Sequence, residues 1–154
     1  HRLLPEKELP SIQKRLEEQV FSLIQQGVKY FGTGGALGFD TLAAQTVLKV
    51  RQTYSEIKLI LVLPCRDQPK HWSQNHQTVY QGILAQADKI VYTSEIYYKG
   101  CMQKRNRHLV DSSAYCICYL TQATGGTAYT VRYAKAQGLT ILSCVDKHVP
   151  PSET

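Results

Sequence analysis

Two glycine-rich segments of the chain have the residue types and the setting of a phosphate-binding loop. The first is Gly32–Asp40 (GTGGALGFD), and the second is Thr124–Thr127 (TGGT). Each follows a short apolar run and precedes a stretch with helical spacing, where a helix N-terminus presents unpaired N–H groups to an anion. Glycine also lets a phosphate approach those groups closely. Either segment alone could be a plain strand-to-helix turn, but the pair favours a nucleotide-type ligand.

A basic segment, Lys104–His108 (KRNRH), lies between the two glycine segments in the sequence. On a helix, Lys104 and Arg107 share one face while Arg105 points elsewhere. The guanidinium group of arginine can donate two parallel hydrogen bonds to phosphate oxygens, so Arg105 or Arg107 could form an ion pair with a phosphate. Asn106 could form hydrogen bonds with a base or ribose. A solvated basic helix face is the ordinary alternative for such a run.

Other common site types have no counterpart in the sequence. Gly34-x-x-x-Gly38 is not a dinucleotide fingerprint and no G-K-S/T follows it, so neither NAD binding nor P-loop chemistry is supported. The 5 histidines form no zinc-binding pattern such as H-x-x-x-H, and no nucleophile elbow is present. We therefore expect no metal and no cofactor.

The 5 cysteines favour a reducing compartment. Their number is odd and they contain no C-x-x-C pair, which argues against a disulfide framework. Cys116 and Cys118 would share one face of a strand, where two buried thiols are the expected arrangement and a metal pair is the alternative. We expect a cytoplasmic protein, and the lack of a charged-then-apolar leader agrees with this expectation.

The composition is that of a globular domain with an excess of positive charge. Apolar residues make up 43% and charged residues 19%, and 18 Lys and Arg against 12 Asp and Glu give a net charge of +6. This excess favours an anionic partner such as a nucleotide or a nucleic acid. The longest apolar run, Leu59–Leu63, is too short to cross a bilayer, so we expect no membrane partner.

Strands and helices alternate along the sequence. Apolar runs predict strands at Val28–Phe31, Ile57–Leu63, Ile90–Tyr92, Tyr115–Leu120 and Leu139–Cys144. Helical spacing predicts helices capped at Ser11 and ended by Gly27, beginning at Asp40, running from about His71 to Ala87, and over Met102–Asp111 and Thr127–Gln137. This alternation is typical of an α/β domain with a mainly parallel sheet. We expect one domain over residues 1–146 and a flexible tail over 147–154.

These segments resemble those of the SLOG superfamily, which contains the SMF/DprA and LOG proteins. Gly34–Ala44 resembles the S-G-x-A-x-G-I-D-x-x-A-H loop, Arg105–Leu109 the R-N-R-x-I segment, and Gly125–Thr130 the third glycine loop. The YpsA-like branch matches best, because His1-Arg2 also fits the T-G-H-R end of its first strand. The resemblance implies a Rossmann-like three-layer sandwich, with a first strand upstream of residue 1, that binds nucleotide-derived molecules.

One departure from the superfamily bears on catalysis. LOG-type phosphoribohydrolases carry P-G-G-x-G-T-x-x-E, and the glutamate needed for N-glycosidic cleavage aligns with Thr130 here. A carboxylate is the natural partner of an oxocarbenium-like transition state, so its replacement argues against that activity. Asp40 is the one motif carboxylate that could act as acid or base. DprA-like binding of single-stranded DNA is a further alternative, because the chain is basic and has tyrosines that could stack on bases.

We expect the chain to bind a nucleotide or nucleotide-derived ligand, of nucleotide-sugar or ADP-ribose type, as a sensor or regulatory domain. The candidate residues are Arg2, Gly34, Gly35, Asp40, Arg105, Asn106, Gly125, Gly126, Thr127 and Tyr129. Phosphate is expected on the glycines and Thr127, with Arg105 pairing its charge. Asp40, Asn106 and Tyr129 would orient the ribose or base. The resemblance suggests that Arg2 closes the site, and that the chain forms a homo-oligomer.

Overall fold

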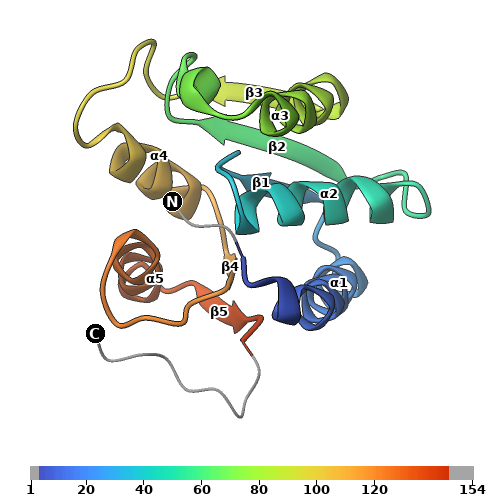
Figure 1. The fold of residues 1–154 in the computed structure, drawn as a ribbon. Helices are drawn as coiled ribbons and strands as arrows, with labels where there is room; N and C mark the ends of the chain where they lie inside the picture. The colour runs from blue at the N-terminus through green and yellow to red at the C-terminus, as the bar shows by residue number, and fades with distance from the viewer. Residues whose placement is uncertain (1–3, 146–154) are drawn as a thin grey trace.

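The computed structural model describes residues 4–145, in which helices and strands alternate as the sequence predicts (Figure 1). The strands are β1 (Tyr30–Thr33), β2 (Lys58–Leu63), β3 (Lys89–Tyr92), β4 (Tyr115–Cys118) and β5 (Thr140–Ser143). The α-helices are α1 (Leu9–Gln25), α2 (Phe39–Arg51), α3 (Gln74–Gln86), α4 (Cys101–Asp111) and α5 (Gly126–Ala136). Short 3-10 helices, η1 (Glu6–Glu8) and η2 (Gln68–His71), precede α1 and α3.

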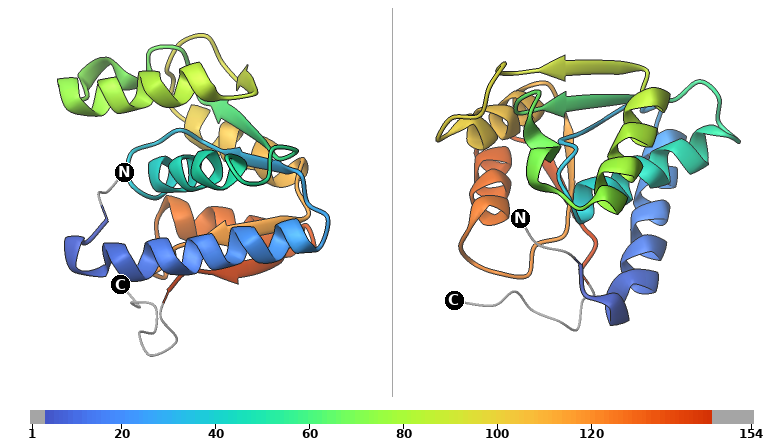
Figure 2. Two further views of the ribbon diagram at one scale, coloured as in Figure 1. Left: turned by 90° about the vertical axis from the view of Figure 1, so that its right-hand side faces the viewer. Right: turned by 45° about the horizontal axis from the view of Figure 1, so that its top comes forward.

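Every pair of neighbouring strands in this part of the chain is parallel. β1, β2 and β3 form one sheet, in which Phe31 lies opposite Leu59, and β4 and β5 form a second, in which Cys116 lies opposite Ile141. Helices α1, α2 and α3 lie on one side of the strands, and α4 and α5 lie on the other (Figure 2). Parallel strands between two helical layers confirm the predicted Rossmann-like α/β fold. The sequence does not predict the division into two sheets.

β2 is the centre of the buried core. Leu59, Leu61 and Leu63 are at most 1% exposed, and β2 has a strand on each of its edges. The strand is apolar on both faces from Leu59 onward, as strands covered by helices on both sides are. α1 joins the same core through Leu16 and Val20, which lie one helical turn apart and are each 1% exposed.

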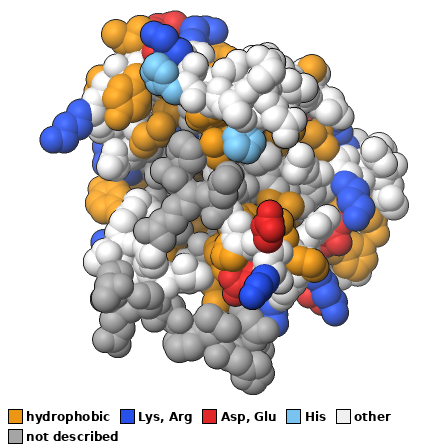
Figure 3. All heavy atoms as spheres, viewed as in Figure 1, with side chains coloured by type: hydrophobic (Ala, Val, Ile, Leu, Met, Phe, Trp, Pro, Cys, Tyr) orange, Lys and Arg blue, Asp and Glu red, His pale blue; other side chains and the backbone are white. Residues whose placement is uncertain are grey.

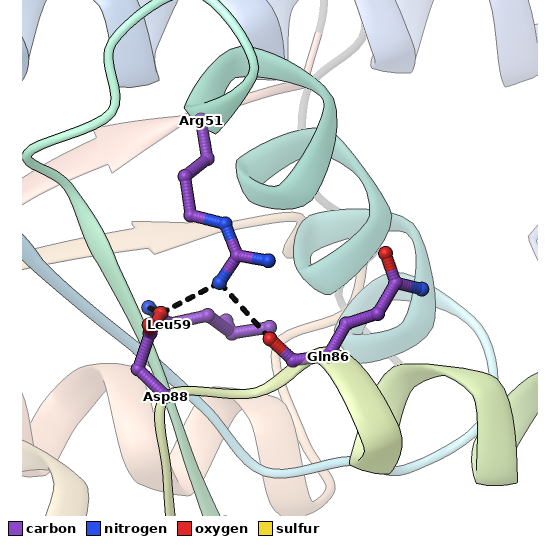
Figure 4. A network of polar contacts seen from close by, with 4 residues as sticks. All are labelled: Arg51, Leu59, Gln86 and Asp88. Carbon is purple, nitrogen blue, oxygen red and sulfur yellow. Dashed lines mark hydrogen bonds and ion pairs between the residues drawn. The ribbon is translucent and has the colours of Figure 1, made fainter.

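The C-terminal end of α2 is fixed to β2 and β3 by one carboxylate. The Oδ2 atom of Asp88 accepts hydrogen bonds from Leu59 N at 2.8 Å and from Arg51 Nη1 at 2.7 Å (Figure 4). Arg51 Nη1 also donates to the carbonyl oxygen of Gln86 at 2.9 Å. The hydrogen bond from Leu59 N, together with the one from Arg51, lowers the pKa of Asp88. These contacts hold α2 in place, so its N-terminus stays at the carboxyl end of β1.

Some helix boundaries differ from the prediction by a few residues. α1 begins at Leu9, so Ser11 lies inside the helix and does not cap it. Pro10 is tolerated in the first turn because backbone N–H groups there make no hydrogen bond within the helix, and proline lacks only that group. α3 begins after Ser73, whose hydroxyl accepts the backbone N–H three residues later at 3.2 Å. Trp72 therefore lies before α3 and not within it.

Some expectations concern residues that the structure does not describe. These are the strand upstream of residue 1, the position of Arg2, and the tail over 147–154. Within residues 4–145, no helix is both long enough and apolar enough to span a bilayer.

Candidate functional site

The carboxyl ends of β1 and β4 border one cavity of about 1690 Å³. The loop after β1 leads into α2, the segment after β4 leads into α5, and each helix has a glycine as its N-cap residue, Gly38 and Gly125 respectively. A glycine cap offers no side chain to the first N–H groups of the helix. The predicted site residues that line the cavity are Gly34, Asp40, Arg105, Asn106, Gly125, Gly126 and Thr127. The fold therefore brings both glycine segments and the basic segment to one place.

A chain of hydrogen bonds through α4 links the two glycine loops. Arg105 donates through Nη1 to the carbonyl oxygen of Gly34, and through Nε to Asn106 Oδ1 at 2.7 Å. Asn106 Nδ2 donates to Thr130 Oγ1 at 3.0 Å. Thr130 Oγ1 in turn donates to the carbonyl oxygen of Gly126 at 3.0 Å. We call this chain of bonds the loop relay; it fixes the spacing of the glycine loops across the cavity.

Arg105 is a buried cation beside a buried carboxyl group. Its side chain is 4% exposed, and loss of water lowers its pKa while the charge of Asp40 opposes that change. Burial likewise raises the pKa of Asp40, against the charge of Arg105 and a hydrogen bond from Ala36 N at 3.2 Å. Arg105 Nη2 also lies 3.8 Å from Met102 Sδ. Three guanidinium nitrogens are therefore engaged inside the protein, so Arg105 positions the loops as well as supplying charge.

The glycines of the first loop are required by close packing. A Cβ on Gly34 would lie 2.5 Å from Arg105 Nη1 and 2.8 Å from Asp40 Oδ2. Gly35 has φ +71, and a Cβ there would lie 2.4 Å from Leu63 Cδ2. Gly35 does not line the cavity, so its role is to let the loop turn over the end of β2.

The glycines of the second loop border open space. Gly125 has φ +102, which favours glycine, but a Cβ on Gly125 or Gly126 would meet no atom within 4 Å. Packing within the described residues therefore does not require a glycine at 126. Thr127 is the second residue of α5 and does not cap it, because the helix begins at Gly126.

Tyr129 lies on the outer side of α5 and not in the cavity. It is 40% exposed, and its hydroxyl accepts a hydrogen bond from Arg107 Nη1 at 3.3 Å. Tyr129 is absent from the cavity lining. A ligand in the cavity could therefore contact Tyr129 only if it extended beyond the edge of the cavity. Arg2 is outside the described residues.

Sequence reasoning missed two polar side chains of this region. Gln68 donates through Nε2 to the carbonyl oxygen of Gly35 at 3.5 Å, and its Oε1 is buried without a hydrogen-bond partner in the described part of the chain. The segment around Gln68 has no signal beyond that of a polar loop. The sequence marks Thr130 only as the replacement of a glutamate, whereas the structure makes it a member of the loop relay. An i−4 bond to Gly126 was the one contact that its helical spacing could predict.

Among residues 4–145, no three His, Cys, Asp or Glu side chains lie where they could share a metal ion. All five cysteines are free thiols, and Cys118 is buried while Cys116 is half-buried.

The part of the chain that matches known proteins contains every described candidate residue. Residues 5–141 match the family model YpsA, described as the YspA SLOG family. A UPF0398 protein of Halalkalibacterium halodurans is 32% identical over 127 residues, which cover 80% of this chain and 67% of the relative. A UPF0398 protein of Bacillus pumilus is 26% identical over 133 residues, with coverage of 84% and 72%. The SPbeta prophage-derived protein YoqJ of Bacillus subtilis is 29% identical over 138 residues, with coverage of 79% and 81%.

Proposed function

This chain belongs to the YspA SLOG family, and we propose that the cavity at the carboxyl ends of β1 and β4 binds a nucleotide or nucleotide-derived molecule, as a sensor or regulatory domain. One observation carries the proposal: the N-terminus of α5 borders unfilled space, since a Cβ on Gly126 would meet no atom within 4 Å. Free N–H groups at a helix N-terminus are well suited to a phosphate. The net charge of +6 favours the same kind of ligand.

In this proposal the phosphate group binds at the N-terminus of α5. Gly125, Gly126 and Thr127 present backbone N–H groups there, and the Thr127 hydroxyl adds a further donor. The charge of Arg105 acts from a buried position, where it attracts an anion more strongly than an exposed arginine would. In this proposal the carboxylate of Asp40 accepts hydrogen bonds that the ribose hydroxyls donate.

Cleavage of an N-glycosidic bond is a second candidate function, and the raised pKa of Asp40 favours it. Burial shifts this carboxyl in the direction that a general acid needs. Against it, Asp40 Oδ2 accepts the N–H of Ala36 at 3.2 Å, and the hydroxyl of Thr130 replaces the glutamate of the LOG motif. Incubation with nucleoside monophosphates followed by chromatography tests this activity. Release of free base would establish it, and unchanged nucleotide would exclude it.

Binding of single-stranded DNA has less support. On the face drawn in Figure 3, Lys and Arg side chains are scattered and do not gather into a stripe. A DNA-binding protein relies on such a basic surface, and its affinity falls steeply as salt rises. Retention of a labelled oligonucleotide that drops steeply with salt would favour this function over a nucleotide site.

Calorimetric titration with AMP and ADP-ribose tests the proposed site. Gly126→Ala adds a methyl group where the phosphate would lie, and the free protein has room for it. We expect the wild type to bind at least one of the two nucleotides. We expect Gly126→Ala to bind it at least about tenfold more weakly. A tenfold loss of affinity corresponds to the free energy of about one charge-assisted hydrogen bond.

The matched control is Gly82→Ala. Gly82 lies in α3, a Cβ there would also meet no atom within 4 Å, and it is not part of this cavity. The control should bind nucleotide as the wild type does. Equal affinity in Gly126→Ala and Gly82→Ala, or no binding of any nucleotide by the wild type, would contradict the proposal.

We further propose that the protein works in the cytoplasm and self-associates. The five free thiols support a reducing compartment. Light scattering coupled to size-exclusion chromatography measures the mass in solution; a value of 17.4 kDa would mean a monomer and would overturn the proposed self-association.

A further inference from the structure

The residues that the sequence assigns to the base of a nucleotide are not placed to bind one. Tyr129 lies outside the cavity lining, and its hydroxyl accepts a hydrogen bond from Arg107. Both polar atoms of the Asn106 amide already belong to the loop relay, since Oδ1 accepts from Arg105 and Nδ2 donates to Thr130. The base of the proposed nucleotide therefore needs a contact that these two residues do not supply.

Most aromatic side chains that line the cavity are engaged within the protein or lie away from the glycine loops. Phe39 stacks on Tyr119, with the ring centroids 6.3 Å apart. Trp72 packs edge-on against Tyr80, with the centroids 5.1 Å apart. Tyr30 is the first residue of β1, so it lies at the end of that strand opposite to the glycine loop. None of these rings presents a free face beside the proposed phosphate site.

Tyr97 also lines the cavity, and its ring is open to a ligand. The side chain is 60% exposed and makes no hydrogen bond or ring contact with any other residue of the described part of the chain. Its neighbours Ile96 and Tyr98 are exposed as well, at 71% and 44%, but they do not line the cavity. An exposed aromatic ring at the edge of a cavity offers an apolar face that a bound molecule can cover.

The loop between β3 and α4 carries Tyr97 and is held on both sides of it. On one side, the carbonyl oxygen of Glu95 accepts the backbone N–H of Arg66 at 3.2 Å, and the two side chains form an ion pair at 2.8 Å. On the other side, the carbonyl oxygen of Tyr98 accepts the N–H of Cys101 at 3.1 Å, and Cys101 is fully buried. Because the backbone around Tyr97 is fixed in this way, little ordering of the loop is needed when a ligand binds.

α4 leads from this loop to the proposed phosphate site. Met102, Arg105 and Asn106 lie about one helical turn apart on one face of α4, and all three line the cavity. Asn106 is hydrogen-bonded to Thr130 in the first turns of α5. The loop before α4 and the loop before α5 lie on the same side of the molecule, at the left in Figure 1 and in the right-hand view of Figure 2. One ligand can therefore reach from the N-terminus of α5 to Tyr97.

We propose that Tyr97 stacks on the base of the bound nucleotide, while the phosphate lies at the N-terminus of α5 as in the proposed function, on which this inference rests. The ligand is then a nucleotide that keeps its base, because a pentose phosphate alone lacks this contact. Stacking on an aromatic ring is possible for any base, since every base has a π face. Tyr97 therefore raises the affinity for nucleotides as a class and does not select one base over another.

Calorimetric titration with AMP, ADP-ribose and ribose-5-phosphate tests this inference. Ribose-5-phosphate has the sugar and the phosphate but no base. We expect Tyr97→Ala to bind the nucleotide at least about fivefold more weakly than the wild type does, and to bind ribose-5-phosphate as the wild type does. Tyr97→Phe keeps the ring and should keep the affinity for the nucleotide.

Tyr98→Ala is the matched control. It removes a neighbouring exposed tyrosine that does not line the cavity, so it should bind nucleotide as the wild type does. Since Tyr97 has no partner in the described part of the chain, the Tm of Tyr97→Ala should equal that of the wild type, which separates a loss of binding from a loss of folding.

Three results would overturn the inference: unchanged nucleotide affinity in Tyr97→Ala, an equal loss in Tyr98→Ala, or an equal loss for ribose-5-phosphate. The proposed phosphate site fails in a different way. If Tyr97→Ala weakens nucleotide binding and Gly126→Ala does not, the phosphate site is contradicted and the base contact stands. If only Gly126→Ala weakens binding, the base contact alone is contradicted. A wild type that binds no nucleotide would contradict both.

Discussion

At the scale of single residues, Arg105 and Asn106 do more than the sequence suggests. Their types predict contacts with a phosphate and a base, but both side chains also hold the glycine loops together. A guanidinium that is 4% exposed needs internal acceptors, and it finds one in the carbonyl oxygen of Gly34, 71 positions away in the chain. No sequence pattern reports a contact over that separation. We therefore expect Arg105→Ala to lower both the stability of the protein and its affinity for nucleotide. This variant cannot distinguish the role of Arg105 in holding the loops from its proposed role in binding phosphate.

Thr130→Val isolates the loop relay at its other end. The change removes the hydroxyl that accepts from Asn106 Nδ2 and leaves this donor without its partner. We expect the free energy of unfolding to fall by about 1–2 kcal/mol, and nucleotide affinity to fall with it, since the spacing of the glycine loops is no longer fixed. Denaturant unfolding and calorimetry measure the two effects.

Thr78→Val is the control for this variant. Thr78 makes the same i−4 bond to a helix carbonyl, to Gln74 O at 2.9 Å, and has no counterpart to the Asn106 contact among its described hydrogen bonds. Its replacement should change stability less than that of Thr130. Equal losses in the two variants would mean that the relay contributes nothing beyond the local helix bond.

At the scale of elements, the order and type of every described strand and α-helix follow from the sequence, and the boundaries do not. The apolar run that forms β2 and the helical spacing of α1 are strong local signals. The start of α3 depends on a hydrogen bond from the backbone to the hydroxyl of Ser73. Several other polar residues in that segment could cap a helix equally well, so the sequence does not indicate which of them does. The burial of Arg105 on α4 depends on where α4 packs, which periodicity in a short basic run does not reveal.

Asp88→Asn tests the contact that holds α2 against β2 and β3. The carboxylate accepts hydrogen bonds from Leu59 N and Arg51 Nη1, so we expect a loss of about 1 kcal/mol of stability at neutral pH. The folded-state pKa of Asp88 is lowered from 3.8, so its stabilisation is complete above that value and is lost as the pH falls through the folded pKa. The difference from the wild type should therefore shrink below about pH 3.8.

Glu95→Gln is the matched control. Glu95 pairs with Arg66 on the surface, with the two side chains 76% and 59% exposed, and such a pair contributes little. Chemical unfolding across a pH series compares both variants with the wild type. A loss in Asp88→Asn no larger than in Glu95→Gln, or one independent of pH, would refute the proposed role of Asp88.

At the scale of the whole molecule, the Rossmann-like layering is predictable and the division of the sheet is not. Alternating strands and helices require parallel strands between helical layers, but no local pattern states which strands are neighbours. That arrangement also decides the candidate site: the glycine loops after β1 and β4 meet because those strands end at the same cavity. The sequence predicts this meeting, because both loops follow strands of one expected parallel sheet, and the resemblance to the SLOG superfamily agrees with it.

The two sheets should differ in local stability. β2 is paired on both edges and its leucines are at most 1% exposed, whereas β4 and β5 form a two-stranded sheet whose residues are largely half-buried. We expect native-state amide exchange to be at least about tenfold faster in β4 and β5 than in β2. Exchange rates in β4 as slow as those in β2 would show that the two sheets open as one unit.

The most direct test of the central claim is a titration of ¹⁵N-labelled protein with AMP, followed by backbone amide chemical shifts. The account predicts that the amides of Gly126 and Thr127 shift first and most, with those of loop 34–38 following through the loop relay. Adenosine, which lacks the phosphate, should leave the α5 N-terminus nearly unchanged. Shifts confined to other surfaces, or equal shifts with AMP and adenosine, would contradict a phosphate site at these glycines.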